Sequence, residues 1–184
     1  MPLDAVATAR LGGPLVALVV VLLAEYLVLA IPVSLLWLWF TDRAAKLDAG
    51  LVFVAVVVSL AVSYGLGLLY AHPAPYQIEA HPLLSGPPEN AFPSQHVTVA
   101  LAMAPALYAV GRRRLAGAFV VVAALVAVAR VAAGLHAPVD VLGSVLAVGI
   151  GVPAVWLLRA PVRRLVALAV RVEDRLWRLV PGRA

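Results

Sequence analysis

The sequence has no cysteine and few charged residues. Cysteine is absent from all 184 residues, so disulfides, thiolate metal sites and a cysteine nucleophile are excluded. Asp, Glu, Lys and Arg make up only 12% of the chain, whereas 64% of the residues are hydrophobic. The mean hydropathy of +1.03 is typical of an integral membrane protein. Little polar sequence remains for a soluble domain, so we expect residues 1–184 to form a single membrane domain.

Five apolar runs predict membrane-spanning helices. A helix needs roughly 20 residues to cross the hydrocarbon core, and the runs lie near residues 15–40, 50–69, 94–110, 115–134 and 138–158. The first run exceeds one crossing, so we expect part of residues 12–20 to tilt, re-enter or lie along the interface. The sequence therefore predicts an all-α, polytopic membrane helix bundle.

Residues 161–180 have a different pattern, in which apolar positions recur at helical spacing between arginines. The apolar positions are Leu165, Leu168, Ala169, Val172, Leu176 and Leu179. Such a segment is typical of an amphipathic helix that lies in the membrane interface. We therefore expect an interfacial helix here instead of a sixth span.

The lysines and arginines indicate how the spans are oriented. Twelve of the 14 fall on one side of the five expected helices, within residues 43–46, 112–114 and 159–183. Short loops rich in Lys and Arg stay cytoplasmic, so residues 70–93 and 135–137 are expected outside. The net charge of +5 is explained by this topology, and we expect no nucleic-acid partner.

Three polar residues lie where the fourth expected helix meets the fifth. Arg130 falls in the last turn of one helix, His136 in the connection, and Asp140 in the first turn of the next. The four-residue spacing lets the carboxylate of Asp140 reach one ring nitrogen of His136, fix its tautomer and stabilise a developing positive charge. The pattern predicts a nucleophilic histidine with an orienting acid.

A second cluster, Pro93-Ser94-Gln95-His96, begins the third expected helix. The first N–H groups of a helix and the positive end of its dipole attract anions, of which phosphate is the natural one. Arg130 is suited to hold two phosphate oxygens in a bidentate contact. The two clusters together predict a phosphate site on the outer side of the membrane.

Each of these residues also has a structural explanation. Ser94 is an ordinary choice for a helix start, and Arg130 with Asp140 could form an ion pair that only supports the fold. Ionisable residues within membrane helices are costly, however, and are most often retained for function. Their combination with His136 favours a functional site.

Glu25 interrupts the first apolar run without a neighbouring cation. Its depth below the outer surface matches that of the two clusters. Two functional interpretations stay open: a protonated carboxyl group that donates to a diphosphate oxygen, or a partner for Arg130. The structural alternative is a glutamate that reaches interfacial water.

The two clusters resemble motifs of the type 2 phosphatidic acid phosphatases. That family's second motif reads Pro-Ser-Gly-His and its third reads Ser-Arg-x5-His-x3-Asp. The chain follows the second motif from Pro93 to His96, with Gln95 in place of the glycine, and the third from Ala129 to Asp140, with Ala129 in place of the serine. Ala24-Glu25-Tyr26, the run from Tyr64 to His96, residues 138–144 and the basic C-terminal helix extend the likeness. Over most of the chain, the sequence is similar to the bacterial undecaprenyl-diphosphatase branch.

The resemblance implies a role for each matching residue. His136 would attack the terminal phosphorus to give a phosphohistidine, Asp140 would support it, and His96 would protonate the leaving oxygen. Arg130 and Ser94, with Gln95 beside it, would bind the phosphate. Water would then hydrolyse the intermediate, and no metal or other cofactor would be required.

The first family motif, Lys-x6-Arg-Pro, is incomplete. Gly67 stands in place of its lysine and Ala74 in place of its arginine, and losing two opposing cations could cost several kcal/mol of phosphate binding. His72 is the nearest candidate replacement, and His81 is a second. Restoring arginine at position 74 would raise activity if the missing cation limits it.

The sequence therefore predicts a lipid phosphatase that acts on a polyprenyl (undecaprenyl) diphosphate. It would work at the outer face of a bacterial cytoplasmic membrane and recycle a lipid carrier for the cell wall or exported polysaccharide. Phosphatidic acid and phosphatidylglycerol phosphate are alternative substrates. A catalytically impaired lipid-phosphate binder or transporter is a different class, which Gly67 and Ala74 suggest and the retained Arg130, His136 and Asp140 oppose. The sequence identifies no particular protein partner and excludes none.

Overall fold

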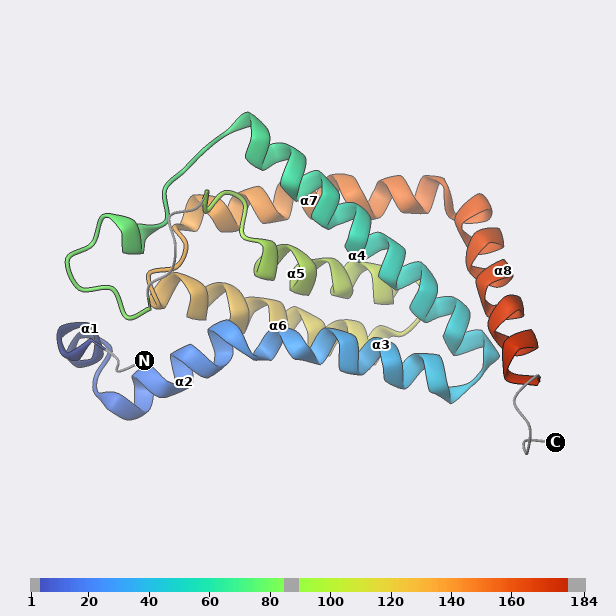
Figure 1. The fold of residues 1–184 in the computed structure, drawn as a ribbon, viewed down its shortest axis with the longest axis horizontal. Helices are drawn as coiled ribbons and strands as arrows, with labels where there is room; N and C mark the ends of the chain where they lie inside the picture. The colour runs from blue at the N-terminus through green and yellow to red at the C-terminus, as the bar shows by residue number, and fades with distance from the viewer. Residues whose placement is uncertain (1–3, 85–89, 179–184) are drawn as a thin grey trace.

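The computed structural model describes residues 4–84 and 90–178. The described residues are 81% helical and contain no β-strand. Figure 1 shows long helices side by side, with one helix crossing their end. The expected all-α membrane bundle is confirmed.

The helices follow one another through short turns, except for one long connection between α4 and α5. Their bounds are α1 Ala5–Arg10, α2 Pro14–Glu25, η1 Leu27–Leu29, α3 Ala30–Thr41, α4 Arg43–Leu69, η2 Pro75–Gln77, α5 Gln95–Ala109, α6 Arg113–Ala132, α7 Pro138–Leu157 and α8 Arg159–Arg178, where η marks a 3-10 turn.

Among the described residues, four helical segments are long and apolar enough to cross a membrane: Pro14–Thr41, Arg43–Leu69, Arg113–Ala132 and Pro138–Leu157. The first combines α2, η1 and α3, so the long apolar run is one broken span. Gly12 and Gly13, which have positive φ angles, separate this span from the short α1. The second expected helix begins at Arg43 instead of residue 50.

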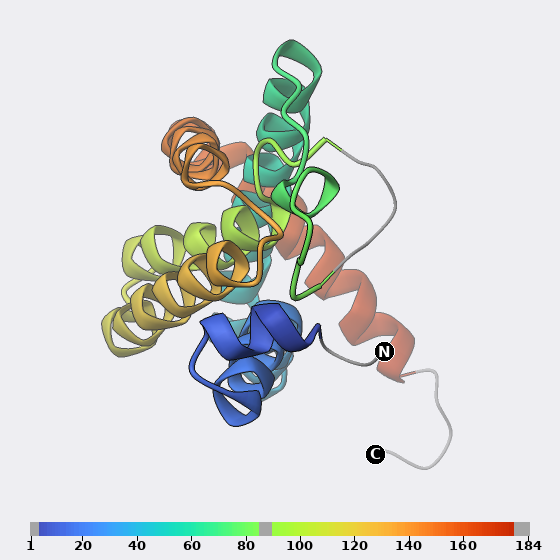
Figure 2. The same cartoon turned by 90° about the vertical axis from the view of Figure 1, so that its left-hand side faces the viewer.

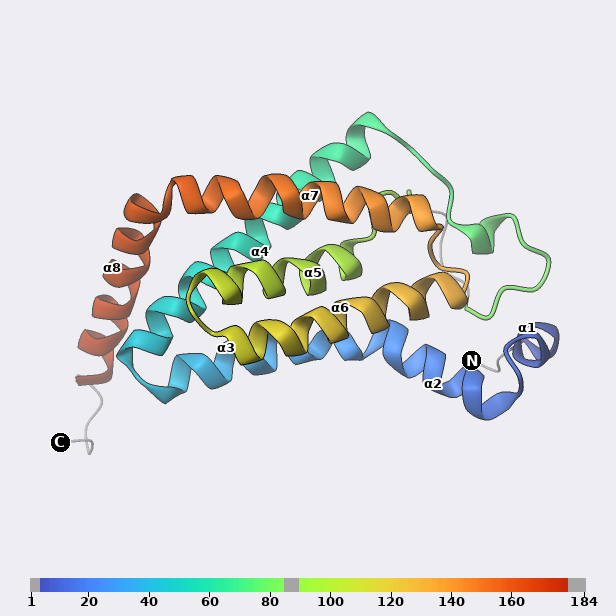
Figure 3. The same cartoon turned by 180° about the vertical axis from the view of Figure 1, so that it is seen from behind.

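The remaining expected span, α5, is shorter than the others. It has 15 residues, which reach about 22 Å, less than the roughly 30 Å of a hydrocarbon core. It packs among α4, α6 and α7, and Figure 3 shows it beside α6 in the middle of the bundle. Figure 3 shows that the first turn of α5 lies further inside the bundle than the end of α6 and the start of α7.

Small residues let the long helices approach closely. A Cβ atom at Gly151 of α7 would lie 2.5 Å from Ser59 Oγ of α4, so glycine is required for this contact. Membrane helices commonly pack through such small residues because lipid provides no hydrophobic drive between helices. The contact packs α4 directly on α7, and both helices also contact the short α5.

The C-terminal helix α8 crosses the end of the bundle that carries most of the arginines (Figure 1). Its buried Val166 and Val170 contact the bundle, while Leu165, Leu168, Val172 and Leu176 are exposed. Lys46 Nζ of α4 lies 3.0 Å from Glu173 Oε2 of α8. Residues 179 and 180 of the expected interfacial helix lie outside the described part.

The opposite end of the bundle gathers α1, the α4–α5 connection and the α6–α7 turn. Figure 2 views the molecule from this end, with α1 and η2 near the viewer. Both polar clusters of the sequence fall at this end, so the fold separates them from the basic end by the length of the bundle.

Candidate active site

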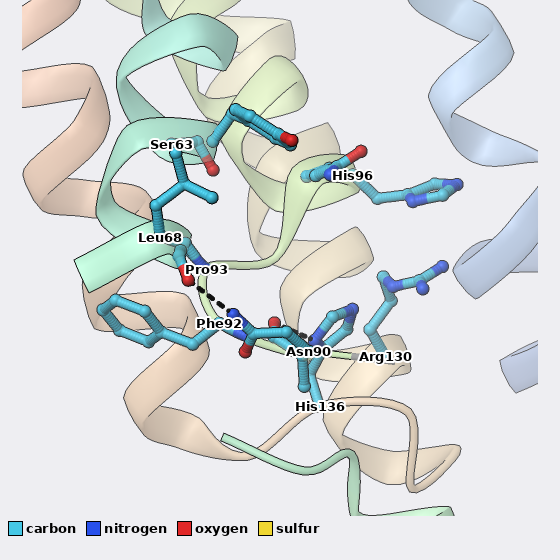
Figure 4. Close-up of a pocket in the computed structure, with 12 residues that line it drawn as sticks. Ser63, Leu68, Asn90, Phe92, Pro93, His96, Arg130 and His136 are labelled. Carbon is cyan, nitrogen blue, oxygen red and sulfur yellow. Dashed lines mark hydrogen bonds between the residues drawn. The ribbon is translucent and has the colours of Figure 1, made fainter. Parts of the chain in front are cut away.

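Residues from both sequence clusters line one cavity of about 400 Å³. This volume is within the roughly 300–1,000 Å³ range of small-molecule sites. Figure 4 shows Ser63 and Leu68 of α4 on one side of the cavity and His96, Arg130 and His136 on the other. The remaining lining residues are Tyr64, Gly67, Asn90, Ala91, Phe92, Pro93 and Gln95.

The tautomer of His136 follows from its contact with the main chain. Its Nδ1 lies 3.0 Å from the carbonyl oxygen of Ala91. A carbonyl oxygen only accepts a hydrogen bond, so Nδ1 carries the proton and donates it. The other ring nitrogen, Nε2, therefore keeps its lone pair, as a nucleophile must.

Asp140 lies behind His136 and is completely buried. Pro138 begins α7, and Asp140 Oδ2 accepts a hydrogen bond of 2.8 Å from the Ala137 N–H. The same oxygen is 3.5 Å from His136 Nδ1. The structure thus brings Asp140 to His136 as the spacing predicts, but the carbonyl of Ala91 is the closer acceptor.

Arg130 reaches the cavity from the last turn of α6, and it is also largely buried. Its Nη1 donates to the carbonyl oxygen of Ala24 at 3.2 Å and lies 3.3 Å from Glu25 Oε1. Glu25 ends α2, next to the 3-10 break. The structure therefore places Glu25 beside Arg130, as one of its two functional interpretations expects.

Helix α5 begins at the cavity, with Gln95 and His96 among its lining residues. The N–H of Thr98 donates the first intrahelical hydrogen bond, to the Ser94 carbonyl. The N–H groups of Gln95, His96 and Val97 therefore have no carbonyl acceptor within the helix. The side chains of Gln95 and His96 line the cavity, whereas Ser94 is completely buried and does not line it. The geometry favours Gln95 and His96 over the Ser94 hydroxyl for contact with a ligand.

Buried hydroxyl groups fix the start of α5 against its neighbours. The Ser94 carbonyl accepts a hydrogen bond from Thr98 Oγ1 at 2.9 Å and lies 2.8 Å from Ser144 Oγ of α7. Ser94 N–H donates to the carbonyl of Asp140 at 3.2 Å. Sequence reasoning gave no role to Thr98 or Ser144, although a hydroxyl within an apolar run is a detectable signal.

Asn90 is another residue that the motifs do not reveal. Its side-chain amide donates to the Gly67 carbonyl at 2.8 Å, and its oxygen accepts from the N–H groups of His72 and Phe92. These bonds hold the end of α4 to the segment that carries Ala91. Asn90 therefore helps to place the carbonyl that fixes the tautomer of His136.

Packing occupies the two positions where the family motif has cations. A Cβ atom at Gly67 would lie 2.8 Å from the main-chain oxygen of Phe92, so a lysine there would displace the loop. Ala74 is completely buried in an apolar cluster that includes Ala91 and Ala129. Of the described residues that line the cavity, Arg130 is the only Lys or Arg.

Neither candidate replacement lines the cavity. His72 Nδ1 lies 3.5 Å from Asp140 Oδ1, whereas His136 faces the other carboxylate oxygen, Oδ2. His81 Nδ1 lies 3.4 Å from Asp4 Oδ2, near the N-terminus. Across residues 4–84 and 90–178, no group of three or more His, Asp or Glu side chains is placed to hold a metal ion.

Comparison with known proteins identifies a family over most of the bundle. The PAP2 superfamily pattern matches residues 48–164. The chain is 31% identical over 143 residues to YbjG of Escherichia coli (strain K12), which is provisionally named an undecaprenyl-diphosphatase. The aligned region covers 76% of this chain and 72% of YbjG. It is 33% identical over 139 residues to undecaprenyl-diphosphatase BcrC of Bacillus subtilis (strain 168), and this aligned region covers 72% of this chain and 70% of BcrC. No solved structure matches the chain.

Proposed function

This chain belongs to the PAP2 superfamily and is a lipid phosphatase, and we propose that its substrate is a polyprenyl diphosphate such as undecaprenyl diphosphate. One observation carries the proposal. His136 holds its Nδ1 proton on the Ala91 carbonyl and lines the same cavity as Arg130 and His96. A nucleophile, a phosphate-binding cation and a proton donor are thereby combined in a membrane bundle.

In the first step, His136 Nε2 attacks the terminal phosphorus of the diphosphate. The new N–P bond forms as the bond from that phosphorus to the bridging oxygen breaks, and His96 gives its proton to this oxygen. The leaving group is the polyprenyl monophosphate. Arg130 and the N–H groups at the start of α5 stabilise the charge on the transferring phosphoryl oxygens.

In the second step, water replaces His136 on the phosphorus. His96 is neutral after it has given up its proton in the first step. In the second step it therefore acts as a general base and accepts a proton from the attacking water. The N–P bond breaks, inorganic phosphate leaves, and Nε2 regains its lone pair. Asp140 stabilises the positive charge on the ring while the phosphohistidine exists.

We also propose that the cavity faces the outside of a bacterial cytoplasmic membrane. The basic end of the bundle, with α8, is then cytoplasmic, in accordance with the positive-inside rule. The polyprenyl chain remains among or against the spans while its diphosphate reaches the recessed cavity. The product would be a lipid carrier ready for another round of cell-wall or polysaccharide export.

The packing at Gly67 and Ala74 favours one other function, an impaired lipid-phosphate binder, because the cavity has lost two cations of the family motif. Phosphate release from the purified protein separates the two. The test compares polyprenyl diphosphate with phosphatidic acid and phosphatidylglycerol phosphate, with and without chelator, alongside His136→Ala.

We expect the wild-type protein to release phosphate from polyprenyl diphosphate at the highest kcat/KM, and His136→Ala to lose on the order of 10³-fold or more in kcat. Tight lipid binding without turnover would favour the binder. Faster release from either glycerolipid would change the substrate, and an undiminished rate in His136→Ala would overturn the mechanism.

A further inference from the structure

The backbone of His72 is anchored to the segment that holds His136. The N–H of His72 donates to Asn90 Oδ1 at 2.9 Å, and its carbonyl accepts from the Ala91 N–H at 2.8 Å. Ala91 in turn accepts the hydrogen bond from His136 Nδ1. His72 is therefore held in a fixed relation to the reacting histidine without lining the cavity.

The imidazole of His72 faces the unused oxygen of Asp140. The distance from His72 Nδ1 to Asp140 Oδ1 is 3.5 Å, a few tenths of an ångström longer than an N–H···O hydrogen bond. Both atoms are buried, and within the described residues neither has a hydrogen-bond partner. The other oxygen, Oδ2, accepts from the Ala137 N–H and lies 3.5 Å from His136 Nδ1.

A completely buried carboxylate is stabilised only when donors satisfy its oxygens, since each unsatisfied polar group carries the full cost of lost hydration. Oδ2 has its donor, and His72 Nδ1 is the group that faces Oδ1. If the distance between His72 Nδ1 and Asp140 Oδ1 shortens by a few tenths of an ångström, both atoms gain a hydrogen-bond partner. The Asp140 carboxylate then lies between the imidazoles of His72 and His136, and these two contacts fix its rotation about the Cβ–Cγ bond.

Resting on the proposed phosphatase activity, we propose that His72 is a positioning residue that donates its Nδ1–H to Asp140 Oδ1 and so holds Oδ2 toward His136. This differs from the role of a substitute phosphate ligand, which the sequence suggests for His72. A phosphate ligand acts mainly on substrate binding, whereas a positioning residue acts on the step in which charge develops on His136.

Four proteins test this assignment: wild type, His72→Leu, His72→Asn and His81→Leu. Asparagine keeps an N–H donor at the place of Nδ1, whereas leucine fills the volume without one. His81 is a matched control, because its imidazole also faces a carboxylate at the outer end, that of Asp4, outside the cavity. The measurements are kcat and KM with polyprenyl diphosphate in detergent micelles, and the thermal unfolding midpoint.

We expect His72→Leu to lower kcat by about 10–100-fold, the range known for partners that orient metal-bound histidines, with KM changed less than about twofold. His72→Asn should recover most of the loss, and His81→Leu should match the wild type. A raised KM at unchanged kcat would make His72 a phosphate ligand. Equal losses in His72→Leu and His72→Asn, with a lowered unfolding midpoint, would reduce its role to packing.

A measurement without substrate separates this proposal from the proposed function. ¹⁵N NMR of labelled histidine reports which ring nitrogen carries the proton, and the His72 signal is identified by its loss in His72→Asn. We expect the Nδ1–H tautomer in the wild type and its loss in Asp140→Leu. The Nε2–H tautomer would overturn the proposal even in an active enzyme, whereas Nδ1–H in an inactive protein would uphold it and reject the phosphatase activity.

Discussion

At the residue scale, the cavity depends on one guanidinium that is already engaged. Arg130 contacts both the carbonyl of Ala24 and the carboxylate of Glu25. The Glu25 side chain is 40% exposed, so it can move away when a phosphate arrives. In the proposed mechanism, the carboxylate neutralises the buried cation before the substrate binds and then competes with the substrate for it.

Glu25→Gln should bind the diphosphate more tightly. Glutamine keeps the shape of the side chain but removes a negative charge that repels the substrate. Since partly exposed ion pairs contribute about 1 kcal/mol or less, we expect KM to fall by up to about fivefold. Steady-state kinetics at two salt concentrations check this, and a raised KM would show that the carboxyl group helps to hold the substrate.

Ala74→Arg should not restore a family-like site. Ala74 is completely buried against apolar neighbours, so the larger, charged side chain must displace the loop or lie in an apolar cluster. Overpacking of this kind costs about 1–3 kcal/mol. We expect a lower unfolding midpoint and no gain in kcat/KM, and activity above that of the wild type would mean that the missing cation does limit catalysis.

At the scale of the elements, the site is positioned by the helix ends that meet around the short α5. The contact of Gly151 with Ser59 joins α4 to α7, and the bonds of the Ser94 carbonyl join α5 to α7. Because these contacts lie within the bundle, a change there should move the catalytic groups without touching them.

Gly151→Val and Gly149→Val make a matched pair on α7. A Cβ atom at Gly151 would lie 2.6 Å from the Cα of Ser59, whereas one at Gly149 would meet no atom within 4 Å. We expect the first variant to lose about 1–3 kcal/mol of stability and much of its activity. Thermal unfolding in detergent measures the loss, and equal behaviour of the two variants would contradict close packing of α4 on α7.

Glu173 predicts how pH affects the docking of α8. Burial raises the pKa of Glu173, but hydrogen bonds from Lys46, Trp39 and Trp177 outweigh it, so its pKa lies below the ordinary value of 4.5. A lowered pKa in the folded state gives stability that is present above the ordinary value and is lost as the pH falls below it. The contribution of Glu173 should therefore be complete at neutral pH.

Glu173→Gln tests this linkage. The difference in unfolding midpoint between wild type and variant should be largest at neutral pH and should shrink as the pH falls below about 4.5, where the unfolded carboxyl group takes up its proton. Asp174→Asn is the control, since its partner Arg43 is 64% exposed and such surface pairs contribute little. A difference that does not vary with pH would contradict the role of the charge.

At the scale of the whole molecule, the sequence predicts the architecture and the family because both depend on strong patterns. Long apolar runs dictate membrane helices, and these are confirmed. The spacing of Arg130 and His136 places both at one helical junction, so it also predicts that they meet. His96 joins them because the start of α5 lies at the same end of the bundle.

Other features have no signal in a single sequence. The Ala91 carbonyl that holds His136 is a main-chain group, which every residue possesses. The ion pair of Lys46 with Glu173 joins positions 127 residues apart, and nothing local selects one glutamate. The location of His72 beside Asp140 depends on the path of the α4–α5 connection. The closeness of His72 to Ala74 in the sequence suggests instead that His72 lines the cavity and binds phosphate.

The central claim is that His136 carries the phosphoryl group, and trapping that intermediate tests it most directly. The purified protein in lipid nanodiscs is mixed with polyprenyl diphosphate labelled in its terminal phosphate and is quenched with alkali, in which phosphohistidine survives. Peptides are then mapped by mass spectrometry. We expect label on His136 that decays as inorganic phosphate appears, and no label in His136→Ala. Full turnover with no phosphate on His136, or with label on another residue, would contradict the account.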